Sequence, residues 1–156
     1  ISISKDRGST LTPPQVLHEF SADDDYTHSG NTALGVADDG AVISLAMAHR
    51  GNEAHTILGW RSEDEGTTWD PVDTSNPAED RSGSVYGNIL RLPRDRLMVF
   101  GHFRSPRPEK GIWVATSDNN GRSWSPPKQV VLLFYFGESA GLCALWSLEL
   151  KIDLNN

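Results

Sequence analysis

The sequence has one cysteine, no long apolar run and fewer basic than acidic residues, and each shortage excludes a class of protein. Its one cysteine, Cys143, excludes an intrachain disulfide framework. The longest apolar stretch, Val130–Phe136, is far too short to cross a membrane, so no membrane span is predicted. The net charge of −7 argues against a general nucleic-acid partner. The N-terminal stretch 1–14 also lacks the apolar segment of a secretory signal.

The composition favours a turn-rich β protein. Among 156 residues there are 14 glycines, 9 prolines and 5 tryptophans, and these residue types suit short strands joined by turns better than long helices. A hydrophobic share of 37% with 22% charged residues is that of an ordinary globular chain. A chain of this length is normally one domain with a real core.

One string occurs twice. The segment 62–69 reads SEDEGTTW, and the segment 117–124 reads SDNNGRSW. Both fit the pattern Ser-x-(Asp/Asn)-x-Gly-x-(Ser/Thr)-Trp. A recurrence at the period that separates Ser62 from Ser117 indicates repeated supersecondary units.

The flanks of the two strings also correspond. Each copy has a Gly-Asn start (30–31 and 87–88), an apolar run, a polar turn and a second apolar run that ends in Arg50 or Arg104. A third run then leads into the string, and short runs of this kind between Gly, Asp and Pro indicate strands and hairpins. With a fourth strand after the string, each copy predicts a four-stranded antiparallel propeller blade. We expect an N-terminal extension or strand in 1–25, blades in 26–75 and 76–129, and a partial third blade or an atypical tail in 130–156.

Within each string the residue types suit a hairpin loop rather than a catalytic group. An Asp or Asn can accept hydrogen bonds from backbone N–H groups two residues on, a glycine supplies positive φ, hydroxyls pin the ends of the loop, and a tryptophan anchors it by burial. We therefore assign a structural role to ten residues: Ser62, Asp64, Gly66, Thr68, Trp69, Ser117, Asn119, Gly121, Ser123 and Trp124.

The two strings resemble the Asp-box, or BNR repeat, of the sialidase (neuraminidase) superfamily, and the similarity extends over about 26–127. ALGVADDGAVISLAMAHR followed by the first string is similar to the first blade of an exo-α-sialidase, and YGNILRLPRDRLMVFGHFR is similar to the second. The resemblance implies an all-β, six-bladed β-propeller, of which two blades and part of a third are visible. We expect the chain to be a piece of a propeller, unless several copies complete a ring as a homo-oligomer.

The resemblance implies catalytic and substrate-binding residues, with one clear departure. Arg50 matches an arginine that lines the family's pocket, and Arg104 ends the equivalent strand of the second copy. The first family arginine falls on Gly30 and is missing. The family's acid/base Asp should follow Arg50, but the segment there contains no Asp. Glu53 either substitutes for it chemically or is an ordinary exposed loop glutamate. Glu138 resembles the glutamate that activates the nucleophilic tyrosine. No tyrosine occurs in the nucleophile's context.

Further clusters have structural or ligand interpretations that the sequence leaves open. Residues 91–110 carry six basic and two acidic side chains, a local charge of +4 that indicates either an anion-steering patch or a solvated surface. The acidic run 23–25 is a solvated loop or, with less support from its spacing, a calcium site. His28, His49 and His102 do not form a zinc spacing, so no metal and no cofactor are predicted.

Three functions are compatible with these patterns. The first is a sialidase-like glycoside hydrolase acting on terminal sialic acid or a related acidic sugar, incomplete in this chain. The second is a non-catalytic Asp-box propeller that binds glycans or a protein partner. The third is a structural fragment without a ligand. The resemblance also favours a secreted or extracellular location.

Overall fold

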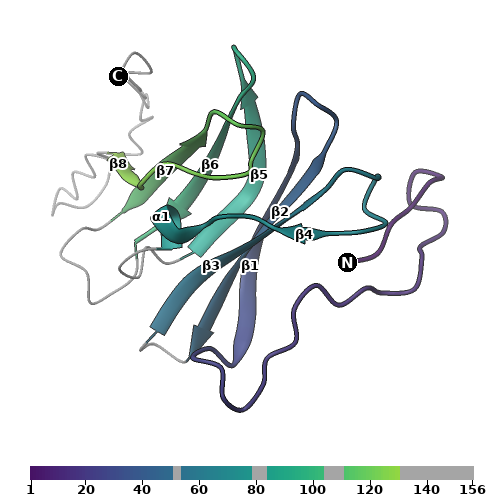
Figure 1. The fold of residues 1–156 in the computed structure, drawn as a ribbon, viewed down its shortest axis with the longest axis horizontal. Helices are drawn as coiled ribbons and strands as arrows, with labels where there is room; N and C mark the ends of the chain where they lie inside the picture. Colours follow the sequence, from purple (N-terminus) through teal and green to yellow (C-terminus); the bar gives the residue numbers. More distant parts are fainter. Residues whose placement is uncertain (51–53, 79–83, 104–110, 131–156) are drawn as a thin grey trace, which may run out of the picture.

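The computed structural model describes residues 1–50, 54–78, 84–103 and 111–130 (Figure 1). It consists of two four-stranded units and one short helix. The first unit contains β1 (His28–Val36), β2 (Val42–Arg50), β3 (Ala54–Ser62) and β4 (Asp70–Pro71). After α1 (Ser75–Ala78), the second unit contains β5 (Ser84–Leu92), β6 (Arg96–His102), β7 (Ile112–Ser117) and β8 (Lys128–Val130). The predicted all-β class is confirmed.

Each unit is an antiparallel meander, as the repeated sequence pattern predicts. The strand order is β4-β3-β2-β1-β5-β6-β7-β8, so the two first strands lie together in the middle. Among the strands of the described residues, β1 and β5 are the pair that runs parallel, over Ala33↔Gly87 and Leu34↔Asn88. Among the described residues the sheet does not close on itself. The arrangement is that of two adjacent blades joined at their innermost strands.

The hairpin turns follow from local sequence. In the first unit, DDG lies between β1 and β2, where Ala37 O accepts a hydrogen bond from Gly40 N (3.0 Å) and Gly40 has φ of 85°. In the second unit, Arg94 and Asp95 both adopt positive φ, 66° and 57°. Two successive residues of positive φ fit the right-handed twist of the flanking strands, as in type I′ hairpins.

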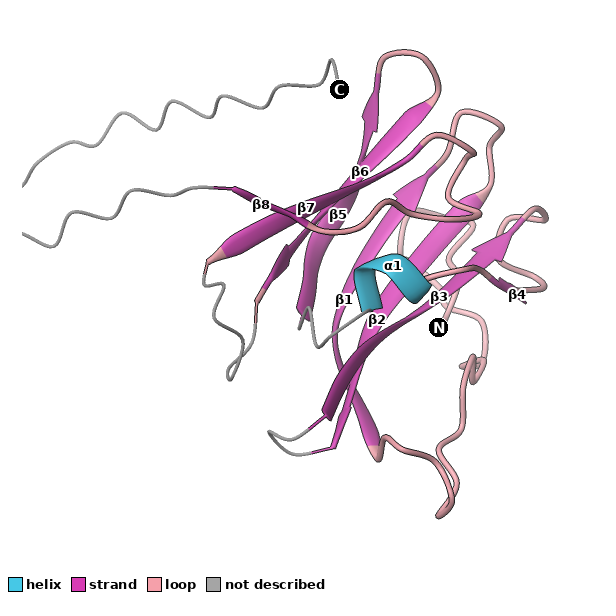
Figure 2. Cartoon of the chain, turned by 60° about the vertical axis from the view of Figure 1, so that its left-hand side comes forward, coloured by secondary structure: helices cyan, strands magenta, loops and turns pink. Residues whose placement is uncertain are grey.

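The core lies between the two units, which face each other in Figure 2. Alternate residues of β2 and β6 point into it, because side chains alternate between the faces of a strand. Its members are Ala33, Ala37, Ile43, Leu45, Ile57, Val85, Ile89, Leu97, Val99, Phe103, Trp113, Ala115 and Trp124. Each large side chain that is fully buried here stabilises the fold by about 1.5–3 kcal/mol.

Trp113 is the largest fully buried side chain, and a glycine makes room for it. A Cβ at Gly101, the residue of β6 paired with Trp113, would lie 1.9 Å from the indole Cζ2. The ring therefore lies directly against the backbone of β6, and any side chain at position 101 would displace it.

Candidate functional site

The turn 62–69, which carries the first string, is held by its own side chains. Ser62 Oγ accepts a hydrogen bond from Gly66 N (2.7 Å) and donates one to Asp64 Oδ1 (2.8 Å). Asp64 accepts two more, from Thr68 N (2.8 Å) and Thr68 Oγ1 (2.7 Å). The half-buried Trp69 indole donates to Gly66 O (2.9 Å) and closes the loop.

These bonds also fix the charge of the turn. The backbone N–H of Thr68, the Thr68 hydroxyl and the Ser62 hydroxyl together lower the pKa of Asp64 from 3.8 to about 2. A hydrogen bond donated to a carboxylate favours its ionised form. Asp64 is therefore an anionic acceptor at neutral pH, and it is not suited to donate a proton in catalysis.

The turn 117–124 has the same bonds around a neutral amide. Asn119 Oδ1 accepts from Ser117 Oγ (2.9 Å) and from Ser123 N (3.0 Å), and Ser117 Oγ accepts from Gly121 N (2.9 Å). Asn119 Nδ2 donates to Ser123 Oγ (2.8 Å), so this bond runs in the opposite direction to its counterpart at Asp64. Trp124 is 3% exposed and belongs to the core.

A third turn of this kind was missed in the sequence. In SKDRGSTL (4–11), Ser4 Oγ accepts from Gly8 N (2.6 Å) and donates to Asp6 Oδ1 (2.8 Å). Thr10 N and Thr10 Oγ1 both donate to Asp6 at 2.8 Å. Leu11, 68% exposed, stands at the tryptophan position. A search that dropped the tryptophan from the pattern would have found this copy, which precedes the turn 62–69 by nearly the same interval that separates the other two turns.

The turns 117–124 and 62–69 are each contacted by the chain segment that precedes their own unit, through equivalent residues. Asp73 N donates to Arg122 O (3.0 Å), and Gln15 Nε2 donates to Thr67 O (3.1 Å). Asp73 and Gln15 hold equivalent positions after the turns 62–69 and 4–11, and Arg122 and Thr67 hold equivalent positions within the turns that they belong to. Segment 4–15 therefore contacts the first unit much as the first unit contacts the second.

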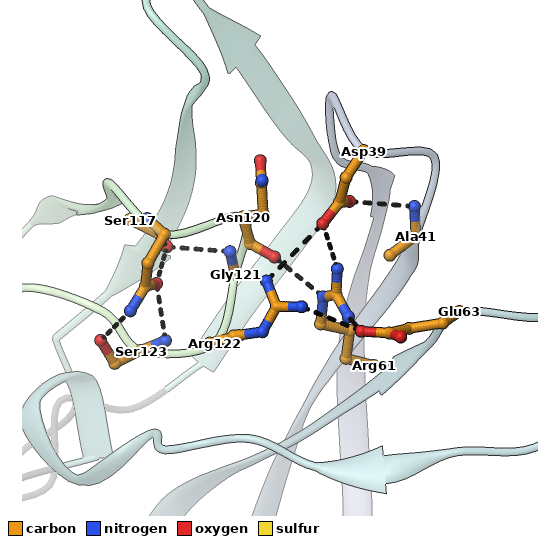
Figure 3. A network of polar contacts seen from close by, with 10 residues as sticks. Asp39, Ala41, Arg61, Glu63, Ser117, Asn120, Gly121, Arg122 and Ser123 are labelled. Carbon is orange, nitrogen blue, oxygen red and sulfur yellow. Dashed lines mark hydrogen bonds and ion pairs between the residues drawn. The ribbon is translucent and has the colours of Figure 1, made fainter.

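A buried arginine joins the two units beside the turn 117–124 (Figure 3). The Arg61 side chain is 6% exposed, its Nε donates to Asn120 O (3.1 Å), and its other nitrogens pair with Asp39 and Glu63. Arg122 pairs with the same two carboxylates, at 3.6 Å to Asp39 and 2.9 Å to Glu63. The nitrogens of Arg61 are engaged within the protein, so this network crosslinks the units rather than offering an anion site.

Arg50 lies at the other end of the strands. It ends β2 and pairs with Ala54 at the start of β3, whereas Ser62 ends β3. At about 3.3 Å per residue, the two ends of β3 are roughly 25 Å apart. We call the first the Arg50 end (28–30, 48–50, 84–87 and 101–103) and the second the turn end (37–41, 61–69, 91–97 and 117–124).

At the Arg50 end, the guanidinium of Arg50 is tied to the N-terminal segment. Arg50 is exposed, and its Nη2 donates to the backbone carbonyl of Asp24. The Asp24 carboxylate accepts a hydrogen bond from Ser21 N (2.6 Å) and lies 3.9 Å from His18 Nε2. These contacts place the acidic run beside Arg50 and leave the Asp24 carboxylate engaged with its own loop.

At Gly30, where the resemblance expects an arginine, packing leaves no room for a side chain. A Cβ at Gly30 would lie 2.3 Å from Met47 Cε, so the methionine occupies the space that a larger residue would enter. Met47 is 4% exposed, and its Sδ accepts a hydrogen bond from Ser84 Oγ (2.9 Å). An arginine at position 30 would need this packing to change.

Comparisons with known proteins address the fold. No family model and no curated protein matches the chain. Among solved structures, the Hadza microbial sialidase Hz136 aligns with a TM-score of 0.61 at 18% identity over 82% of this chain. A protein of unknown function from Dyadobacter fermentans aligns with a TM-score of 0.60 at 17% identity, also over 82%.

The fold is part of a sialidase-type β-propeller. The chain spans only 30% and 37% of the lengths of these two structures. At such low identity the likeness concerns the fold alone. In this propeller frame β1 and β5 are the innermost strands of two adjacent blades, and β4 and β8 are the outermost.

Three of the four predicted catalytic and substrate-binding residues lie outside the part of the chain that the structure describes: Glu53, Arg104 and Glu138. Of the four predicted catalytic and substrate-binding residues, Arg50 is the one that the structure describes. Its position at a strand end is compatible with a ligand role, which stays a prediction.

Only part of the basic stretch 91–110 lies in the described residues. Arg91 pairs with Asp38, and Arg94 lies in the β5–β6 turn, both at the turn end. From Arg96, β6 runs about 20 Å to His102 at the Arg50 end. Arg104 and the basic residues after it follow that far end and lie outside the described residues. The predicted anion-steering patch therefore stays a prediction.

Within the ranges given above, no group of three or more His, Cys, Asp or Glu side chains is placed to hold a metal ion. No helix in that part of the chain is long and apolar enough to cross a membrane.

Proposed function

We propose that the Arg50 end binds the carboxylate of an acidic sugar such as terminal sialic acid. This would make the chain a glycan-binding piece of an Asp-box propeller. The proposal rests on a difference between the partners of the arginines at the two ends. Arg61 and Arg91, at the turn end, pair with carboxylates, whereas the exposed Arg50 donates to a neutral carbonyl. Its charge is not neutralised by that bond, and a guanidinium can bind a carboxylate through two parallel hydrogen bonds.

Hydrolysis is the second candidate, favoured by the fold shared with a sialidase. In it Arg50 and Arg104 would hold the sugar carboxylate, Glu53 would exchange the proton with the leaving oxygen, and Glu138 would activate a tyrosine. Gly30 weighs against it, because Met47 fills the space where the resemblance expects the first arginine. Binding without turnover by this chain is therefore the preferred function.

The test of binding uses 2-O-methyl-α-sialoside, which carries the carboxylate and cannot be turned over readily. Titration followed by NMR should show binding by the wild type and none by Arg50→Ala. Arg50→Lys should bind more weakly than wild type, because an ammonium lacks the bidentate fork. Arg91→Ala, which removes an arginine from the turn end, is the matched control and should bind normally. Equal binding by Arg50→Ala and wild type would reject the site.

A fluorogenic sialoside assay separates the two candidates. Turnover that is lost in Glu53→Gln while sialoside binding persists would establish the hydrolase. Binding without any turnover by the wild type would establish the binding module.

We also propose that copies of the chain associate through the faces of the innermost strands. Leu34 and Val36 of β1 are 50% and 46% exposed, and Tyr86 and Leu90 of β5 are 44% and 40% exposed. In a closed propeller such positions are covered by neighbouring blades. Light scattering should give a mass above one chain for the wild type and the mass of one chain for Leu34→Lys. One chain per particle for the wild type at high concentration would reject this association.

A further inference from the structure

The N-terminal segment 1–15 repeats the hydrogen bonds that flank the turn of the second unit. Thr12 N donates to Ile3 O (2.8 Å), and Ile3 N donates to Thr12 Oγ1 (2.9 Å). In the second unit, Ser125 N donates to Thr116 O (2.8 Å), and Thr116 N donates to Ser125 Oγ (3.0 Å). In both cases the two residues lie directly before and directly after the turn. The chain therefore enters and leaves both turns in the same way.

These paired bonds continue further from the turn. Ile1 N donates to Gln15 O and Gln15 N donates to Ile1 O, both at 2.7 Å. Counted from their turns, the equivalent residues of the second unit are Val114 and Lys128, which pair across β7 and β8. An exchange of both bonds between opposite residues is the pattern of an antiparallel ladder. Segment 1–15 therefore carries the bonds that join the third strand, the turn and the fourth strand of a unit.

Segment 1–15 also lies against the first unit as the first unit lies against the second. Arg61, directly before the turn of the first unit, bonds to Asn120 O in the next turn. Ile3, directly before its own turn, lies against the next turn in the same way, since a Cβ at Gly66 would be 2.9 Å from Ile3 Cδ1. The segment therefore occupies the place of the outer edge of a unit that precedes the first.

One face of the first unit, which we call the open face, is apolar and partly exposed. Directly opposite residues of neighbouring strands lie on the same face of a sheet. The register of β1, β2 and β3 therefore places five apolar side chains on the face that points away from the second unit: Leu34, Val36, Val42, Leu58 and Trp60. The two on β1 are 50% and 46% exposed, and the other three are half-buried. A packing partner would bury the rest of these side chains.

The equivalent face of the second unit is covered. Counted back from the turn of each unit, the residues that correspond to Leu58 and Trp60 are Trp113 and Ala115. Both are at most 1% exposed and belong to the core between the units. They share that core with alternate residues of β2 and β3. By the same arrangement, the open face would be covered by alternate residues of the second and third strands of a preceding unit.

We propose that segment 1–15 and the open face together dock a three-stranded antiparallel β-meander, which completes a third blade. Each described unit consists of three long strands, a turn and a short fourth strand. Segment 1–15 supplies the turn and the bonds on both sides of it, so the partner supplies the three inner strands and no turn of this kind. Its third strand lies in line with residues 1–3, and aliphatic side chains at alternate positions of its second and third strands cover the open face.

A second copy of the chain fits this surface less well. Both of its units carry their own turn and fourth strand, and these would fall on the place that segment 1–15 occupies. The docking goes beyond the proposed sugar binding and does not depend on it, because it uses apolar side chains and backbone bonds rather than Arg50.

The test attaches such a meander to the whole chain. Residues 28–58 contain β1, β2 and most of β3, and they end directly before Gly59, the equivalent of Ile1. Fused directly before Ile1, they should form the inner strands in register with segment 1–15. The fusion should raise the thermal midpoint by roughly 5 °C or more, since burial of several partly exposed apolar side chains stabilises a domain.

Tryptophan fluorescence reports the docking directly, because residues 28–58 contain no tryptophan. Trp60 lies on the open face, so the fusion should shift the emission to shorter wavelength. Trp60→Phe in the fusion should remove most of that shift. The stabilisation should not depend on protein concentration, and a gain that appears only at high concentration would assign the face to a second copy and overturn the proposal.

A fusion that is one residue longer, with 28–59 before Ile1, is the matched control. The slip by one residue moves every side chain of the copied strands to the opposite face. This control should give neither the higher midpoint nor the emission shift. Equal effects of the two fusions, or no effect of the fusion in register, would overturn the proposal.

The unfused chain tests segment 1–15 by itself. In the wild type, the amides of Thr12 and Gln15 should be protected from hydrogen exchange, because both donate to backbone carbonyls. Ser4→Ala removes the hydroxyl that holds the turn and should speed their exchange by about tenfold. Ser9→Ala is the matched control, since the bond that Ser9 makes in this turn is donated by its backbone N–H. Absence of protection in the wild type would overturn the proposal.

Discussion

The turns 62–69 and 117–124 have nearly the same internal hydrogen bonds but different surroundings. Trp69 is half-buried and bonds to its own loop, whereas Trp124 is 3% exposed within the core between the units. Asp64 is ionised, and Asn119 at the same position is neutral. The comparison shows that the repeated string determines the shape of the turn, while the neighbouring unit determines how much the turn adds to stability.

The difference follows from what lies under each turn. The turn 117–124 packs on the first unit, where Arg61 bonds to Asn120 O and Asn76 Nδ2 donates to Trp124 O (2.8 Å). The turn 62–69 packs on the N-terminal segment, through Ile3 and Gln15. The turn 117–124 is therefore buried against a complete four-stranded unit, whereas the turn 62–69 is covered by one irregular segment and stays partly exposed.

Substitution of the two tryptophans should give the largest contrast. Trp124→Ala removes a ring from the core and should destabilise the chain by about 3–5 kcal/mol, enough to unfold it in practice. Trp69→Ala should cost clearly less, because its ring is only half-buried and lies outside the core between the units. Urea unfolding monitored by circular dichroism compares the two. A larger loss for Trp69→Ala would show that the turn 62–69 is the more important anchor.

The glycines of the two turns should give the next contrast. Gly66 and Gly121 both have positive φ, 88° and 81°, so alanine is strained at either position. A Cβ at Gly121 would also lie 2.2 Å from Cδ1 of the fully buried Ile43, whereas at Gly66 it would lie 2.9 Å from the half-buried Ile3. Overpacking of a core typically costs about 1–3 kcal/mol. Gly121→Ala should therefore lower the thermal midpoint more than Gly66→Ala, and equal shifts would mean that strain alone dominates.

The sequence predicts the turns well because their bonds are local. Asp64 and Thr68 lie within one turn, and their contact needs no information from elsewhere in the chain. The apolar runs likewise predict the strands, since alternation along a strand reflects one buried face.

The candidate sites could not be predicted in the same way. Leu34 and Trp60 come to share one face only through the register of β1, β2 and β3, and Arg61 meets Asn120 only when two units pack. The basic stretch 91–110 stays an open prediction, because Arg104 and the basic residues after it lie outside the described residues. The turn 4–11 was missed because Leu11 replaces the tryptophan by which the string was recognised.

Ion pairs at the turn end should show a smaller contrast. Arg61 is buried and bonds to the backbone of the turn 117–124, whereas Arg91 is 54% exposed and pairs with Asp38. Arg61→Ala should cost about 1–3 kcal/mol, since it leaves Asn120 O without its donor and a void between the units. Arg91→Ala should cost at most about 1 kcal/mol, as exposed pairs generally do. Chemical denaturation at low and high salt separates the two, because only the Arg91 effect should vanish when charges are screened.

The smallest expected difference between the two turns is in how acid changes the stability of the fold, and it depends on the charge of Asp64. The folded-state pKa of Asp64 is about 2, below its ordinary value of 3.8, so its hydrogen bonds stabilise the fold above pH 3.8. That contribution is lost as the pH falls from 3.8 toward about 2, because the unfolded chain then takes up a proton more readily.

Exchange of the two turn residues tests this dependence. Asp64→Asn should remove this part of the acid sensitivity while changing stability little at neutral pH, since Asn119 shows that an amide makes equivalent bonds. Asn119→Asp should add the same sensitivity to the second turn. Acid unfolding titrations of the wild type and both variants measure the effect. Each variant is compared with the wild type, because Asp6 and Asp73 also have lowered pKa values and contribute equally to all three proteins. Identical acid midpoints for the three proteins would mean that the charge of Asp64 does not distinguish the two turns.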